Sequence, residues 1–431
     1  MGQGTAARTL GLWSALALVV GNMIGSGIYL LPATLAPLGA NALAGWGVTI
    51  AGAMCLAYVF ARLSARVPGE GGPYAFANAA FGPAAGFFTA WSYWVLVWAG
   101  NGAVAVAVVS ALAAIVPGLR SGVAPALLAL ALVWLLIAVN VRGVALAGRV
   151  QVVTTALKLM PLLGVVLLAA WLLLRDGGGA VAANPPVPLS AGAVAGAAAL
   201  TFWGFLGVEA ATVPAERIPD ARRVIPLVTI AGTALAGLAY VLVAAAVGLL
   251  MPAAQIAQSP APIADFLGRS LGNGTGAVVA LFAAVSAFGA LNGFILIEGE
   301  MPYAMAKGGV FPRWFAKESR TGTPARAHLV SGVLVTLVLA LNYTAESGEL
   351  FAAIASISLA AGMLAYLASA LAGMRLLTGE PVARVVAMMA AGFVAWMIWG
   401  LGAKANLWGL GLLAAGLPVF LWVRRAGTAV R

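Results

Sequence analysis

Long apolar stretches, separated by short segments that carry the charges, recur along the whole chain. A helix needs roughly 20 apolar residues to cross a bilayer core about 30 Å thick. On this basis the stretches divide into twelve expected spans: 12–38, 41–62, 84–115, 122–141, 150–174, 191–215, 225–251, 275–306, 327–343, 349–374, 383–401 and 405–423. The longest interruption, residues 252–274, favours a short surface helix outside the membrane. The pattern predicts an all-α membrane protein with twelve transmembrane helices.

Two of the expected spans contain glycine-rich interruptions near their middle. The first span includes Gly21-Asn22-Met23-Ile24-Gly25-Ser26-Gly27, and the sixth includes Thr201-Phe202-Trp203-Gly204-Phe205-Leu206-Gly207-Val208-Glu209. Glycine lowers helix propensity by about 1 kcal/mol relative to alanine, which favours unwinding at these points. Freed backbone groups are tolerated in a membrane only where they are buried or line a cavity. Close helix packing at small residues is the alternative interpretation, but paired interruptions five spans apart favour a binding site at the membrane midplane.

The composition of the chain is incompatible with several classes of protein. Of the 431 residues, 63% are hydrophobic and 8% are charged, and the mean hydropathy is +1.04. Too few charges are present to cover the surface of a soluble enzyme, a secreted domain or a nucleic-acid-binding module. Cys55 and His328 are the only cysteine and histidine, so disulfide frameworks, zinc clusters and Ser-His-Asp catalysis lack their parts. We therefore expect no enzyme, no catalytic residue, no cofactor and no metal.

The basic residues predict the orientation of the chain. With alternate loops assigned to opposite sides, 18 of the 23 lysines and arginines fall on one side. Four fall on the other side, namely Arg120, Arg175, Arg269 and Lys404, and Lys158 lies inside the fifth span. Because cytoplasmic loops are enriched in lysine and arginine, we expect a multi-pass protein of a bacterial inner membrane with both termini in the cytoplasm.

Four motifs resemble those of the amino acid/polyamine/organocation transporters. They are Gly21-Asn22-Met23-Ile24-Gly25-Ser26-Gly27-Ile28, Pro68-Gly69-Glu70-Gly71-Gly72-Pro73-Tyr74, Trp203-Gly204-Phe205-Leu206-Gly207-Val208-Glu209 and Lys307-Gly308-Gly309-Val310-Phe311-Pro312. Tyr93-Trp94, Trp98 and Gly100-Asn101 are most similar to the branch of bacterial arginine/agmatine antiporters and their basic amino acid relatives. The resemblance implies one transmembrane domain, 1–431, with an inverted five-plus-five repeat of the leucine-transporter kind, helices 1 and 6 being broken. The repeats would span about 12–174 and 191–374, followed by two additional helices at about 383–423.

The first interruption is suited to bind the main-chain groups of an amino acid. Backbone N–H groups of Gly25, Ser26 and Gly27 open the outer half-helix and would hold a carboxylate. Free carbonyl groups of Met23, Trp203 and Leu206 would accept the ammonium. The resemblance implies the same roles for these positions. The full expected substrate site comprises Asn22, Met23, Gly25, Ser26, Gly27, Trp203, Leu206, Phe294, Asn101 and Ser358.

Side-chain recognition is expected around Trp203 and Phe294. The Trp203 ring can stack on a cationic or apolar substrate side chain. Phe294 matches a position where the arginine/agmatine branch has tryptophan, a better face for a cation. Leu96 and Val97 replace smaller residues of that branch and leave less room for a long head group. By resemblance, Asn101 and Ser358 hydrogen-bond the substrate side chain, although such residues also join helices.

Few ionisable groups lie within the expected spans, and such groups are usually functional. The resemblance suggests a proton-linked role for Glu209, and Tyr93 is a candidate gate above the site. Lys158 either titrates or supports the carbonyl groups of the first interruption, and both roles disfavour sodium coupling. Glu298 and Glu300 follow Phe294, and Glu300 is expected to be a solvated charge at the end of its helix.

These features predict a secondary active transporter that works by alternating access. It would exchange an amino acid, with a cationic amino acid as one option, for a related amino acid or amine. A proton-coupled symporter with broad neutral specificity is the alternative, suggested by Lys158, Phe294, Leu96 and Val97. The expected partners are the amino acid or amine and the lipid bilayer, with protons and a homodimer left open and nucleic acid excluded. Catalytic clusters and filter motifs are not evident in the sequence, which disfavours a membrane enzyme or a channel.

Overall fold

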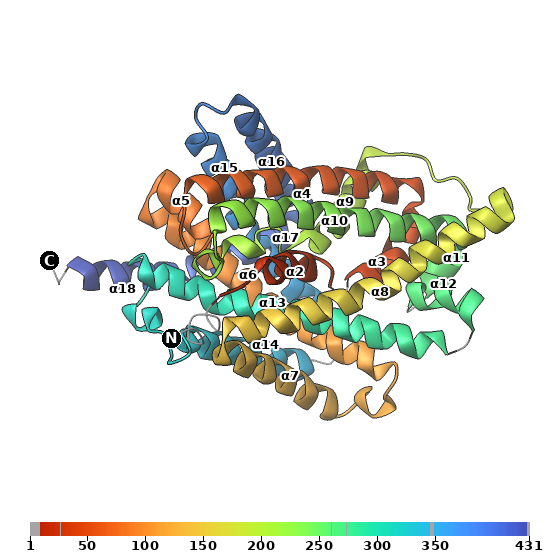
Figure 1. Ribbon diagram of the computed structural model, residues 1–431, viewed down its shortest axis with the longest axis horizontal. Coiled ribbons are helices and arrows are strands. Elements are labelled where there is room, and N and C mark those ends of the chain that lie inside the picture. Colours follow the sequence, from red (N-terminus) through yellow and green to blue (C-terminus); the bar gives the residue numbers. More distant parts are fainter. Residues whose placement is uncertain (1–8, 26, 260, 273, 345–348, 429–431) are drawn as a thin grey trace.

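The computed structural model describes residues 9–25, 27–259, 261–272, 274–344 and 349–428, and all regular secondary structure in these ranges is helical (Figure 1). The α-helices are α2 Leu12–Met23, α3 Gly27–Leu35, α4 Ala40–Arg66, α5 Pro73–Phe81, α6 Pro83–Ala113, α7 Ala124–Arg142, α8 Val144–Asp176, α9 Ala191–Phe202, α10 Ala221–Leu250, α11 Ala253–Gln258, α12 Pro262–Leu271, α13 Thr275–Lys307, α14 Ala325–Thr344, α15 Glu349–Leu376, α16 Pro381–Gly400, α17 Gly402–Ala414 and α18 Leu417–Thr428. Short 3₁₀ turns connect several of them, including η4 Trp203–Phe205, η5 Ala210–Thr212, η6 Ala215–Arg217 and η7 Arg313–Ala316.

Within the described residues, eleven helical segments are long and apolar enough to cross a membrane. Each overlaps one of the expected spans from the second to the twelfth. The expected first span, 12–38, contains two separate helices, α2 and α3, of which α2 is an apolar helix of 12 residues. The chain is therefore an all-helical, multi-pass membrane protein.

The first interruption begins where α2 ends. Ile24 follows α2 with φ −79° and ψ 84°, outside the helical region, and α3 starts at Gly27. Figure 1 shows α2 in the middle of the bundle, and α2 packs against α8, α10 and α13. The backbone groups released at the end of α2 consequently lie inside the protein and are shielded from lipid, as the physics of a bilayer requires.

The second interruption follows α9 and is longer. The α-helix ends at Phe202, after which 3₁₀ turns and irregular turns continue until α10 begins at Ala221. Gly207 has φ +105°, a conformation that favours glycine. A Cβ atom added at Gly207 would lie 2.6 Å from the Cβ of Asn22. Glycine thus allows the chain after α9 to touch the end of α2.

The sequence favours one surface helix in the segment 252–274, whereas the described residues of this segment form two, α11 and α12. Pro262 occupies the first turn of α12, where a missing N–H costs nothing. Ser259 lies between the two helices; its Oγ accepts a bond from the Ala261 N–H and donates to Asp265 Oδ2. Proline and these local hydrogen bonds explain why the segment divides.

Candidate functional site

A small cavity of about 40 Å³ lies where the two interruptions meet. Its lining residues are Asn22, Met23, Gly25, Gly27, Leu96, Val97, Gly100, Asn101, Val104, Trp203, Gly204, Leu206, Ala290 and Phe294. Eight of the ten expected substrate residues are in this set. Ser26 lies outside the described residues, and Ser358 is buried in α15 without lining the cavity. The volume holds only a few water molecules, so a substrate the size of an amino acid requires the walls to separate.

Lys158 supports the first interruption. Its fully buried ammonium on α8 donates to the carbonyl oxygens of Gly21 (2.8 Å), Ile24 (2.8 Å) and Ser286 (2.9 Å). The Ser286 Oγ on α13 also donates to Gly25 O at 3.0 Å. These donors compensate carbonyl groups that the helix no longer pairs. The geometry is that of a support between helices, one of the two roles expected for Lys158.

Tyr240 connects both interruptions, a role that the sequence did not indicate because one tyrosine in an apolar span has no recognisable pattern. Its hydroxyl, on α10, donates to Met23 O at 2.6 Å and to Gly204 O at 3.0 Å. The Met23 carbonyl also accepts from the Gly25 N–H at 2.9 Å, so the expectation of a free carbonyl at Met23 is wrong. Among the described residues, the Trp203 carbonyl accepts a long bond, 3.4 Å, from the Leu206 N–H.

The opposite part of the cavity is mostly apolar. Leu96 and Val97 of α6 and Phe294 of α13 form its walls together with Trp203. Asn101, also on α6, contributes an amide, and its Nδ2 donates to the buried Glu298 Oε2 at 2.6 Å. This arrangement suits a substrate with an extended aliphatic stem and a polar end.

Glu209 lies beside the cavity and does not line it. Its carboxylate is fully buried after η4, and Oε1 accepts a hydrogen bond from the hydroxyl of Tyr93 on α6. The hydroxyl of Tyr366 on α15, also fully buried, lies near the same carboxylate. The structure therefore places Tyr93 and Glu209 together, and it links the second interruption to α6.

A charged cluster at one end of the bundle surrounds Arg217 of η6. Arg217 Nε lies 3.4 Å from Glu300 Oε1, and its Nη2 lies 2.9 Å from Glu318 Oε1. The hydroxyl of Tyr303 donates to the same Glu318 oxygen at 2.8 Å. Glu300 is only 2% exposed, so the expectation of a solvated charge is wrong. The reason is that η6, far away in sequence, covers the end of α13 with an arginine.

A second part of this cluster surrounds Lys307 at the end of α13. Lys307 Nζ contacts Glu216 Oε2 (2.7 Å) and Glu70 Oε2 (3.4 Å). Burial, reinforced by the nearby Glu300 carboxylate, raises the pKa of Glu70 to about 8. Glu70 lies in the loop 67–72, whose Gly72 has φ +41° and fits against Thr212, where any Cβ would clash. Contacts of Lys307 with Glu216 and Glu70 thus join η6 and the loop 67–72 to α13, and the raised pKa leaves Glu70 largely protonated at neutral pH.

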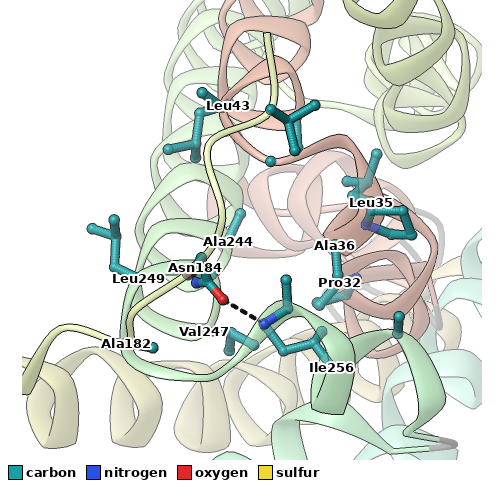
Figure 2. Close-up of a pocket in the computed structure, with 18 of the residues that line it drawn as sticks. Pro32, Leu35, Ala36, Leu43, Ala182, Asn184, Ala244, Val247, Leu249 and Ile256 are labelled. Atoms are coloured by element: carbon teal, nitrogen blue, oxygen red, sulfur yellow. Dashed lines mark hydrogen bonds between the residues drawn. The ribbon is translucent and has the colours of Figure 1, made fainter.

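A larger cavity of about 570 Å³ is separate from this site (Figure 2). Its walls come from α3, the start of α4, residues 181–187, α10 and α11, and are mostly apolar. Asn184 binds the neighbouring backbone: its Oδ1 accepts from the Ala253 N–H (2.6 Å), and its Nδ2 donates to Gly248 O and Met251 O. Its amide is therefore engaged in holding the loop to α10 and α11, and the cavity offers little to orient a zwitterion.

Within the described residues, no group of three or more His, Cys, Asp or Glu side chains is placed to hold a metal ion.

Comparison with known proteins agrees with this architecture. Residues 10–423 match the family described as amino acid permease. The cadaverine/lysine antiporter of Escherichia coli strain K12 is 32% identical over 367 residues, which cover 84% of this chain and 82% of that protein. The arginine/ornithine antiporter of Pseudomonas aeruginosa is 29% identical over 437 residues (96% and 90% covered). A putrescine transporter of Haemophilus influenzae is 26% identical over 397 residues (90% and 91%). The match over nearly the whole chain shows that this protein belongs to the amino acid permease family.

Proposed function

We propose that this protein is a secondary active antiporter that exchanges a cationic amino acid for a related amino acid or amine across a bacterial membrane. The observation that carries the proposal is the meeting of two interrupted helices at one cavity, in a chain similar to antiporters for lysine and cadaverine and for arginine and ornithine. Interrupted helices at such a position supply the backbone dipoles that bind the charged ends of an amino acid.

In this proposal the chain crosses the membrane twelve times, and α2 and α3 are the two halves of one broken span. The first five spans and the next five would form the inverted repeat of a single transmembrane domain, and the last two would be additional. The N–H groups that open α3, with Ser26 in the sequence before it, bind the substrate carboxylate. The carbonyl of Leu206 remains the best acceptor for the ammonium, since Tyr240 and Gly25 already engage Met23.

Alternating access would depend on the charged cluster at one end of the bundle. The charged cluster of Arg217, Lys307 and their carboxylates joins the loop 67–72, η6 and α13, and the positive-inside pattern would place it at the cytoplasmic end. With these ion pairs formed, the inner path is closed. Their separation would open the cavity to the cytoplasm and allow the substrate to leave.

A proton-coupled symporter of neutral amino acids is the second candidate, favoured by the apolar walls that Leu96, Val97 and Phe294 contribute. In that case Glu209, buried beside Tyr93, would carry the proton. The two candidates differ in what must be present on the far side of the membrane.

Transport by the purified protein in liposomes tests the proposal. We expect uptake of labelled lysine only when the vesicles contain lysine, cadaverine or a similar substrate. Uptake into empty vesicles driven by a pH gradient would instead support the symporter. Trp203→Ala should reduce exchange strongly, because it removes a wall of the cavity, whereas Trp399→Ala on α16, 75% exposed, serves as the matched control. Normal exchange by Trp203→Ala would show that the site is elsewhere.

A further inference from the structure

Glu298 has a position that neither the helix interruptions nor the charged cluster explains. It is fully buried in α13, four residues after Phe294, so the two side chains share one face of the helix. Phe294 lines the cavity, and the Glu298 partner Asn101 lines it as well. Glu298 therefore stands directly behind the part of the wall that would face a substrate side chain.

The carboxylate of Glu298 is incompletely compensated. Oε2 accepts the Asn101 amide at 2.6 Å, but Oε1 has no partner within the described part of the chain, and neither has Asn101 Oδ1. Among the described residues no lysine or arginine is ion-paired with Glu298. A buried carboxylate without a cation is costly, and such groups within membrane segments are usually functional. Two neighbouring acceptors without donors match a group that has several N–H bonds and a positive charge.

Glu300, two residues further, provides the internal contrast. It points to the other side of α13 and is paired with Arg217 at 3.4 Å. Its charge is thus compensated within the protein, whereas that of Glu298 is not. The difference indicates a role for Glu298 that involves a cation from outside the chain.

We infer that Glu298 and Asn101 form the cation-binding end of the substrate site, which receives the distal ammonium or guanidinium of a cationic amino acid, or the second amine of a diamine. This inference rests on the proposed function and specifies its substrate class. In the present structure the Asn101 amide donates to Glu298 in the manner of a substrate N–H. On binding, the substrate cation takes over this donor role, and Oε1 of Glu298 and Oδ1 of Asn101 gain donors. The aliphatic stem lies against Phe294 and Val97.

Competitive exchange measurements with three compounds test the inference. Lysine, cadaverine and norleucine share a linear carbon chain, but norleucine has no distal ammonium. With the unaltered protein, we expect lysine and cadaverine to bind more tightly than norleucine. Glu298→Gln should weaken lysine and cadaverine by about tenfold or more, and norleucine by less than about twofold, because only the charged hydrogen bond is lost. Glu298→Asp, which keeps the charge, should retain the preference for lysine over norleucine.

Glu300→Gln is the matched control, since it removes a carboxylate of the same helix that does not contact Asn101. It is expected to change the exchange rate equally for all three compounds and to leave their affinity ratios unaltered. An equal loss for all three compounds in Glu298→Gln, or no loss in a monodisperse variant, would overturn the inference while leaving the antiporter intact. An unaltered protein that exchanges norleucine but neither lysine nor cadaverine would overturn the proposed cationic function itself, and the inference with it.

Discussion

Tyr240→Phe tests how strongly the two interruptions depend on one hydroxyl group. The substitution removes the donor to Met23 O (2.6 Å) and Gly204 O (3.0 Å). The ring itself should stay in place, because it stacks on Trp46 with centroids 4.7 Å apart and contacts Phe205 at 5.5 Å. The change therefore isolates hydrogen bonding from apolar packing.

The magnitude follows from the two lost bonds. Each is expected to contribute about 0.5–1.5 kcal/mol, and Gly204 O is left buried without its donor, so a total of about 1–3 kcal/mol is expected. That energy corresponds to a factor of about 5–150 in an equilibrium constant. If Tyr240 holds both interruptions in every state, the loss lowers the stability of the whole protein. If it holds them only in the closed arrangement, the loss alters substrate affinity.

Thermal unfolding of the purified protein and its dissociation constant for lysine distinguish these outcomes. Because large membrane proteins often unfold irreversibly, the variants are compared at one heating rate. Tyr58→Phe is the control, since Tyr58 is a half-buried residue of α4 whose hydroxyl forms no hydrogen bond with the described residues of either interruption. Should Tyr240→Phe change neither the unfolding temperature nor the affinity, the hydroxyl would not be what joins the two interruptions.

Two further substitutions probe the backbone and the charged cluster. Gly207→Ala is expected to lower stability and exchange, because alanine is strained at φ +105° and its Cβ would lie 2.6 Å from that of Asn22. Gly192→Ala is the control and should be neutral, because Gly192 has open space around it. Equal unfolding temperatures for the two variants would contradict this reasoning. Glu70 has a pKa of about 8 in the folded protein against an ordinary 4.5, so the folded state binds the proton more tightly. Its stabilising contribution is complete below pH 4.5 and is lost as the pH rises through 8. Glu70→Gln should reduce the fall in unfolding temperature over this pH range. If the unfolding temperatures of the variant and the original protein fall in parallel with pH, the pKa of Glu70 is not raised in the folded protein.

Much of the candidate site could be predicted, because local sequence determines where a helix is interrupted. Glycine at 21, 25, 27, 204 and 207 marks where main-chain groups leave the helix, and a bilayer forces such groups into the interior. The residues nearest the interruptions, such as Met23, Trp203 and Leu206, could therefore be named in advance, and they line the cavity. The hydrogen bonding of their carbonyl groups could not be predicted, because the donor to Met23 O is Tyr240, 217 residues away in the sequence.

The sequence by itself determined that the chain is helical and crosses a membrane several times, which stretches are long and apolar enough to do so, and where the helices α2 and α9 end. These properties depend on composition and on neighbours within a few positions. Only the tertiary structure decided which polar groups compensate one another: Lys158 with the end of α2, Arg217 with Glu300, and Asn101 with Glu298. A span surrounded by lipid and by other apolar helices can rotate about its axis without changing its hydropathy. The partner of a buried charge is therefore decided by packing between distant segments and is not apparent along the chain.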